Sequence, residues 1–218
     1  SGEYKLMGLA PYGKPVFKDL IIEKLMDLKT DGSFKLNMEF FNYATGLTMT
    51  NNKFSKLFGN PVRDPKKDLL TEFHMDIAAS IQLVTENIML SLAKSLKKEY
   101  DIKNLCLAGG VALNCVANGK ILKEKIFENI WIQPAAGDAG GSLGSALALW
   151  HIENGNKRVV NPNDNMKGSY LGTEFTQMKI EEELKSAGAN FVTLNYEDLI
   201  DKTSDYLSNE KAIGWFQG

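Results

Sequence analysis

Residues 104–153 contain, twice in succession, a strand-like run, a glycine-rich turn and a helix-like run, and this order leaves few possible folds. The run "NLCLAGG" precedes the helix-like "VALNCVANGKILKEKI", and "NIWIQP" precedes a second glycine-rich turn and "GGSLGSALALWHIE". Apolar runs stopped by glycine or proline predict strands, so we expect a parallel βαβ unit. Right-handed crossovers place both turns at the carboxyl edge of the sheet, where open α/β sheets bind ligands. Gly109, Gly110 and Asp138 should therefore lie close together.

The glycines in these turns indicate access to the backbone. A helix N-terminus exposes unpaired N–H groups and a partial positive charge, and it can accept phosphate oxygens where no side chain blocks the approach. Gly109, Gly110 and Gly137 would supply that access. Asn114 could cap the first helix or point its amide at a ribose or phosphate. The stretch lacks both the G-x-G-x-x-G spacing and the eight-residue P-loop pattern.

Asp138 stands at the start of the second glycine-rich helix. Local sequence favours equally a helix N-cap and a ligand to a hard cation. The small residues Gly140, Gly144 and Ala148 form a stripe that predicts close packing of another backbone.

The two cysteines and the two histidines do not indicate a site of their own. Cys106 and Cys115 are predicted to be small buried residues rather than a disulfide or half a metal site. His74 is expected on a helix face and His151 at a helix C-terminus, too far apart to share a metal ion.

The segments on either side are mainly helical in pattern. A helix over 19–29 and a turn at Asp31 and Gly32 are predicted. They are followed by a long amphipathic helix, either continuous or broken once, with Asp64 as its cap, Pro65 at its first position and a small Ala78–Ser80 step. Residues 155–166 are polar and rich in Asn, Gly and Pro, which predicts a linker. Beyond it we expect two helices flanking a strand at 190–194, and a further strand over 211–218. A domain ending on a strand suggests a fragment.

Composition excludes several classes of function. The net charge is −2 and only Arg63 and Arg158 are arginine, so no basic stripe predicts a nucleic-acid surface. No apolar run approaches the ~18 residues of a membrane span, and no secretory signal is evident. A reducing, cytoplasmic location is expected.

Three stretches in order, "GEYKLMGLAPYGKP", "LAGGVALNCVANGKI" and "IQPAAGDAGGSLGSAL", resemble the O-carbamoyltransferases typified by nodulation-factor, cephamycin and tobramycin carbamoylating enzymes. The resemblance implies an α/β fold: the second lobe of an actin/hexokinase/Hsp70-type ATPase domain over residues 1–154, then from residue 167 the start of a domain like threonylcarbamoyl-adenylate synthase. It implies ATP and carbamoyl phosphate as substrates, carbamoyl-adenylate as intermediate, and a small hydroxyl-bearing acceptor.

The same resemblance assigns residues. Gly109, Gly110 and Asn114 match its nucleotide-contacting motif, with Gly137 beside them, and Asp138 matches an aspartate that helps to hold a metal ion, expected to be iron. Glu3, Lys5, Tyr12 and Gly13 match a motif that lines the same cleft. A paired-histidine motif and an arginine-rich segment of the family have no match, so the chain alone is expected to lack transferase activity and to bind ATP or iron weakly.

Three alternatives stay open. A tRNA threonylcarbamoyl transferase would share the fold and the aspartate, but the segment after residue 167 and the "GLAPYG" loop argue against it. A noncatalytic nucleotide-binding module of the same fold is the second alternative. A dinucleotide-binding domain is disfavoured because the glycine fingerprint is missing.

Overall fold

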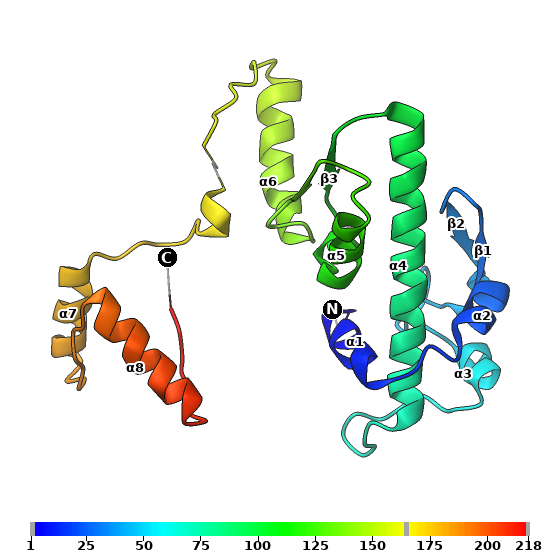
Figure 1. The fold of residues 1–218 in the computed structure, drawn as a ribbon, viewed down its shortest axis with the longest axis horizontal. Helices are drawn as coiled ribbons and strands as arrows, with labels where there is room; N and C mark the ends of the chain where they lie inside the picture. The colour runs from blue at the N-terminus through cyan, green and yellow to red at the C-terminus, as the bar shows by residue number, and fades with distance from the viewer. Residues whose placement is uncertain (1–2, 164–165, 217–218) are drawn as a thin grey trace. The chain divides into compact units, whose positions relative to one another are not determined.

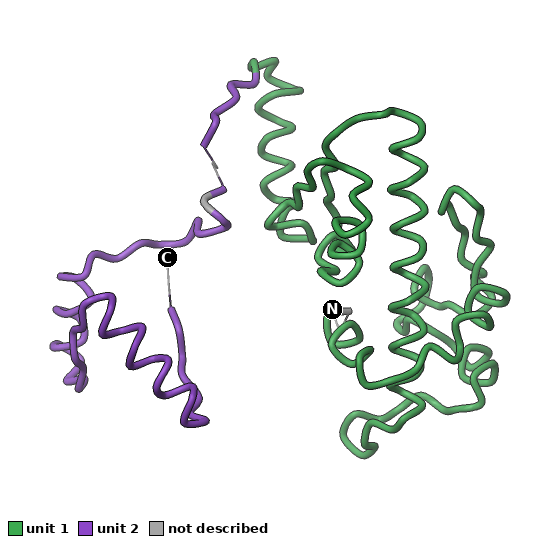
Figure 2. Tube along the Cα trace, in the orientation of Figure 1, with its two compact units in different colours: residues 1–157 green, residues 158–218 purple. Residues whose placement is uncertain are grey.

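The computed structural model describes residues 3–163 and 166–216 and divides the chain into two compact units, residues 1–157 and 158–218 (Figure 2). The division falls inside the stretch predicted as a linker. No helix of the described residues is long and apolar enough to cross a membrane.

The long helix α4, Glu72–Tyr100, is the central element of the first unit (Figure 1). The helix predicted from Asp64 is not continuous: it is broken after a turn at Asp64, and α4 itself begins only at Glu72. The Asp64 carboxylate accepts the N–H of Lys66 at 3.0 Å and so caps a single isolated turn. Thr71 is extended and is the actual N-cap, and its N–H donates to Nδ1 of His74 at 3.0 Å. His74 therefore lies on the helix as predicted, in its first turn, where its ring accepts the N–H of the N-cap residue.

The N-terminal elements pack along α4. These are α1 (Glu3–Leu9), a 3-10 turn (Ala10–Tyr12), α2 (Lys18–Leu20) with a π-helical turn (Ile21–Leu25), the hairpin β1 (Met26–Leu28) and β2 (Phe34–Leu36), a 3-10 turn (Met38–Phe40) and α3 (Asn52–Phe58). The predicted helix over 19–29 ends at Leu25, because Met26 is extended and pairs with Leu36. The predicted turn at Asp31 and Gly32 is confirmed, and Gly32 has a φ of 90°. The core here consists of Ile21, Leu25, Phe58, Val84 and Ile88.

The predicted βαβ unit, which packs against the C-terminal half of α4, is confirmed. Strands β3 (Asn104–Leu107) and β4 (Asn129–Ile132) are parallel, and between them run a 3-10 turn (Gly110–Leu113) and helix α5 (Cys115–Lys123). Figure 1 shows β3 and α5 beside α4. Their core with α4 consists of Ala93, Leu105, Ile121 and Phe127. The chain thus places a parallel pair of strands and α5 against one long helix.

The opposite face of this strand pair is open within the described residues. The prediction that the cysteines are buried is wrong, because both are exposed. Leu105 points into the core, so the alternation of side chains along β3 turns Cys106 to the other face of the strand pair. On that face Cys106 lies beside its pairing partner, the half-exposed Trp131. Cys115 is exposed at the first position of α5.

Helix α6, Ala139–Ala148, continues into a π-helical turn, Leu149–Glu153. The small residues of this helix were predicted to permit close packing of another backbone, and this holds for Gly140 but not for Gly144 among the described residues. A Cβ on Gly140 would lie 2.2 Å from the Ala135 carbonyl oxygen, so this glycine permits close approach of the preceding loop. A Cβ on Gly144 would meet no described atom within 4 Å.

The second unit contains the predicted helices, α7 (Gln177–Ser186) and α8 (Tyr196–Ser208), after a 3-10 turn (Lys167–Ser169). The strands predicted at 190–194 and 211–218 are wrong for the residues described, because 190–194 and 211–216 are without strand pairing. A strand needs a partner for its N–H and C=O groups, and the described part of this unit offers none. Residues 217 and 218 lie outside the described part.

Candidate functional site

The two glycine-rich turns meet at the carboxyl ends of β3 and β4. Cys106 pairs with Trp131 and Leu107 with Ile132, and the register continues where Gln133 N–H donates to the Leu107 carbonyl at 3.0 Å. Gly109 N–H then donates to the Ala136 carbonyl at 2.8 Å, which joins the two turns directly. The two turns therefore lie side by side, as predicted, and Asp138 follows two residues after Ala136.

The backbone of these turns is uncovered. Gly109 has φ 101° and ψ 161°, a conformation that is essentially restricted to glycine. A Cβ placed on Gly109, Gly110 or Gly137 would meet no heavy atom within 4 Å. Open space over three glycines is what close approach of a ligand to the backbone requires.

Several backbone N–H groups in and just after the first glycine-rich turn are unpaired. Among the described residues, Gly110 and Val111 have no hydrogen-bond acceptor for their N–H groups, and the same holds for Cys115 and Val116 at the start of α5. Such groups carry partial positive charge and suit an anion. The arrangement can bind phosphate oxygens through main-chain donors.

Asn114 caps α5, one of the two roles that the sequence left open. Its Oδ1 accepts the Ala117 N–H at 3.1 Å. The same oxygen accepts from Nε2 of Gln82 at 3.1 Å, and Nδ2 of Asn114 donates to Oε1 of Gln82 at 3.0 Å. The amide is therefore tied to α4 as well as to its own helix.

Sequence reasoning missed the polar group behind Asn114. Gln82 and Glu86 are buried on α4, at 6% and 4% exposure, and Nε2 of Gln82 donates to Oε1 of Glu86 at 2.8 Å. Oε2 of Glu86 is bound by Lys120 of α5. The signal in the sequence was a glutamine and a glutamate four residues apart on the apolar face of a helix, between Ala78 and Ile88.

Asn118 of α5 binds the 3-10 turn Gly110–Leu113 through its side chain. Its Nδ2 donates to the Ala112 carbonyl at 2.7 Å, and the residue is 8% exposed. Its Oδ1 is buried without a partner among the described atoms. This residue, too, was not singled out from the sequence.

Asp138 is exposed and occupies the N-cap position of α6, but its side chain makes no capping hydrogen bond. The cap interpretation of this carboxylate is therefore not realised. Within residues 3–163 and 166–216, no group of three His, Cys, Asp or Glu side chains is placed to hold a metal ion. The described residues offer one carboxylate here, which does not by itself make a metal site.

The N-terminal motif packs on α4. Lys14 N–H donates to Oδ1 of Asp76 at 2.7 Å, and Phe17 N–H donates to Oγ of Ser80 at 3.0 Å, so the predicted small step on α4 does receive a close neighbour. A Cβ on Gly13 would lie 2.1 Å from the Met75 carbonyl carbon. Gly13 therefore serves close packing against α4.

Helix α1 brings the same motif to the start of α5, where the sulfur atoms of Met7 and Cys115 are 4.0 Å apart. Lys5 and Tyr12 are exposed, and Lys5 lies over the ring of Tyr4. The side chain of Glu3 lies outside what the structure describes. For Lys5 and Tyr12, the described interactions include no contact with the glycine-rich turns.

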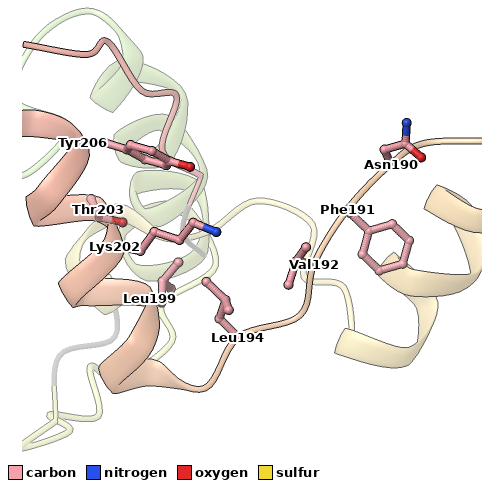
Figure 3. A pocket seen from close by; sticks show the side chains of 8 residues that line it. All are labelled: Asn190, Phe191, Val192, Leu194, Leu199, Lys202, Thr203 and Tyr206. Atoms are coloured by element: carbon pink, nitrogen blue, oxygen red, sulfur yellow. The ribbon is translucent and has the colours of Figure 1, made fainter. Parts of the chain in front are cut away.

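Two of the hollows among the described residues are lined by residues other than those of the turns. An apolar one is bordered by α1, α3 and α4, with Lys5, Arg63 and His74 at its wall. In the second unit, residues 190–194 and helix α8 enclose a shallow one, where Leu199, Lys202 and Tyr206 face the extended segment (Figure 3). Neither is lined by Gly109, Gly110, Asn114, Gly137 or Asp138.

The chain matches one family model and is similar to several known proteins. A family model described as the carbamoyltransferase N-terminus matches residues 1–147. The uncharacterized protein sll1178 of Synechocystis sp. is 58% identical over 220 residues, which cover 100% of this chain and 36% of that protein. Nodulation protein NolNO of Sinorhizobium fredii is 32% identical over 217 residues, covering 99% of this chain and 30% of the relative. Nodulation protein NolO of Bradyrhizobium diazoefficiens is also 32% identical, with 99% and 37% covered. The chain thus spans about a third of the length of these curated relatives.

Proposed function

Since this chain belongs to the carbamoyltransferase family, we propose that it forms part of an O-carbamoyltransferase whose ATP site includes the two glycine-rich turns after β3 and β4. The acceptor would be a small molecule with a hydroxyl group. The residues proposed to contact the nucleotide are Gly109, Gly110 and Gly137 through their backbone, and Asn114 through its side chain.

The observation that carries this proposal is the hydrogen bond from Gly109 N–H to the Ala136 carbonyl, 2.8 Å long. It joins the turns of two adjacent parallel strands at their carboxyl ends, the edge where open α/β sheets bind ligands. The uncovered glycines beside it admit a triphosphate without displacing a side chain. The free N–H groups of Gly110 and Val111 supply donors for its oxygens.

The proposed reaction proceeds in two balanced steps. In the first, water cleaves carbamoyl phosphate into carbamate and inorganic phosphate, and a carbamate oxygen then bonds to the α-phosphorus of ATP while pyrophosphate leaves, which gives carbamoyl-adenylate. The acceptor hydroxyl oxygen then attacks the carbamoyl carbon, AMP leaves, and the hydroxyl proton is released. Main-chain donors at the turns would bind and orient the phosphates in the first step.

The proposal extends to the fold. We interpret the first unit as the second lobe of an actin/hexokinase/Hsp70-type ATPase domain, which is supported by its parallel βαβ unit against a long helix. The second unit would begin a domain like threonylcarbamoyl-adenylate synthase. Its described residues are two helices and extended segments, which support this assignment only through their place after the linker.

A metal ion, expected to be iron, is the remaining part of the proposal. Asp138 is free to act as a ligand, because its carboxylate is exposed and caps no helix. The described residues do not complete a coordination sphere, so no step of the reaction is derived through a metal. Asp138→Asn in the complete protein should lower its metal content while the fold is kept, and an unchanged content would remove Asp138 as a ligand.

The nucleotide site is tested by calorimetric titration of the complete protein with ATP. Gly110→Val should weaken ATP binding at least tenfold, because the side chain fills the space that the phosphates need. Gly119→Ala on α5 is the control, since a Cβ there also meets open space but lies within the helix and away from the turns. Equal affinities for both variants would contradict the proposed site.

A further inference from the structure

A buried carboxylate sets the direction of the hydrogen bonds behind the proposed nucleotide site. Glu86 of α4 is 4% exposed, and Lys120 of α5 binds its Oε2. A carboxylate only accepts hydrogen bonds. Whatever donates to its other oxygen, Oε1, must therefore present N–H or O–H, and that group is Nε2 of Gln82 at 2.8 Å.

This contact fixes the orientation of the Gln82 amide. With Nε2 directed to Glu86, the carbonyl oxygen Oε1 of Gln82 is available as an acceptor only. It accepts from Nδ2 of Asn114 at 3.0 Å, while Nε2 donates its second proton to Oδ1 of Asn114 at 3.1 Å. Each polar atom of the Gln82 side chain is used, as burial demands.

Asn114 is oriented in turn. Its Oδ1 accepts from both Gln82 and the Ala117 N–H, so both lone pairs are engaged. Its Nδ2 carries two protons, and one of them goes to Gln82. Among the described residues the second proton has no acceptor, and Asn114 is only half buried. A ligand at the start of α5 would therefore meet this side chain as a donor.

We propose that the relay of Lys120, Glu86, Gln82 and Asn114 fixes the Asn114 amide as a hydrogen-bond donor to a phosphate oxygen of the nucleotide. Gln82 and Glu86 are then positioning residues that act through Asn114. This inference rests on the proposed function for the identity of the ligand. The orientation of Asn114 itself rests on the hydrogen bonds alone.

The positioning role is tested without ligand by amide hydrogen exchange. Gln82→Met removes the partner that orients Asn114, and Glu86→Gln keeps the size of residue 86 but allows the amide at Gln82 to turn round. The Ala117 N–H is bound by the Asn114 side chain, whereas the Asn118 N–H is bound by the Asn114 backbone carbonyl and serves as the reference. In both variants, the ratio of the Ala117 exchange rate to the Asn118 exchange rate should rise about fivefold. Asn87→Met, an exposed change on the same helix, is the matched control. An unchanged ratio in both relay variants would overturn the positioning role.

The donor role is tested by adding ATP to the complete protein with labelled asparagine side chains. In the wild type, the Asn114 Nδ2 resonances should shift on binding, and Gln82→Met should weaken ATP binding about tenfold. If ATP binds while these resonances stay in place, or if Gln82→Met binds it as tightly as Asn87→Met does, the donor role is overturned. If the wild type binds no ATP, the proposed function and the donor role both fail, and the hydrogen-exchange ratio still decides the positioning role.

Discussion

Gln82 of α4 and Asn114 at the start of α5 face each other as a reciprocal amide pair, with N···O distances of 3.1 and 3.0 Å. One residue lies on the central helix and the other in the motif after the glycine pair. The pair therefore ties the turn at Gly109 and Gly110 to the core of the first unit.

Asn114→Ala should lower the free energy of unfolding by about 2 kcal/mol. Loss of the α5 cap contributes about 1 kcal/mol, and the buried Gln82 amide loses a partner, which adds a similar amount. Urea denaturation measures the change. The control is Asn129→Ala, which breaks the exposed amide contact of Asn129 with Asn104, 2.9 Å long, and should cost under about 0.5 kcal/mol. Equal losses of unfolding free energy in both variants would mean that the Asn114–Gln82 pair stabilises the protein no more than an exposed amide contact does.

Gly109→Ala should destabilise the first unit by about 1 to 3 kcal/mol, because φ 101° with ψ 161° is a conformation that alanine avoids. Gly110→Ala should change the free energy of unfolding little, since its Cβ enters open space from a helical turn. Thermal unfolding of the two variants side by side makes the comparison. A larger loss at Gly110 than at Gly109 would show that the geometry of this turn is wrong.

Gly13→Ala should cost about 1 to 3 kcal/mol, because its Cβ would overlap the backbone of Met75 at 2.1 Å. Gly8→Ala in α1 is the matched change: its Cβ meets nothing within 4 Å, and alanine favours the helix by up to about 1 kcal/mol. Chemical denaturation should thus give effects of opposite sign. If Gly13→Ala is neutral, the motif at Ala10–Tyr12 does not pack on α4 as described.

Asp31 should make the β1–β2 hairpin sensitive to acid. Hydrogen bonds from the Ser33 hydroxyl and backbone N–H lower the pKa of the Asp31 carboxyl below its ordinary value. The carboxylate therefore stabilises the hairpin above the unfolded pKa, and this contribution is lost as the pH falls through the lowered folded pKa. An NMR titration should show the pKa of Asp31 rising in Ser33→Ala. Lys29→Met is the control and should raise it less, because the Lys29 charge is the weakest of the causes. The reverse order would refute this account.

The sequence predicts the βαβ unit well because its signals are local. Strand-like runs, glycine turns and helical spacing all lie within residues 104–153, and the parallel pairing of β3 with β4 confirms them. The sequence does not reveal where α4 starts. Asp64 and Pro65 carry a helix-start signal that serves only one turn, and the capping contact at the true start uses an unusual residue pair, Thr71 and His74.

Other features depend on contacts that spacing does not reveal. The exposure of Cys106 follows from which face of β3 meets α4, and the missing strand at 190–194 follows from the lack of a partner in the described residues. At the site, the meeting of the two turns could be predicted from topology. The pairing of Gln82 with Asn114 could not, because the two residues are 32 positions apart.

We propose that the complete protein activates a carbamoyl group as its adenylate at the glycine-rich turns. The measurement that tests it without knowledge of the acceptor is the exchange of labelled pyrophosphate into ATP. The account predicts exchange that requires carbamoyl phosphate and is lost in Gly110→Val but kept in Gly119→Ala. Absence of exchange in the wild-type protein, or equal exchange in Gly110→Val and Gly119→Ala, would contradict it.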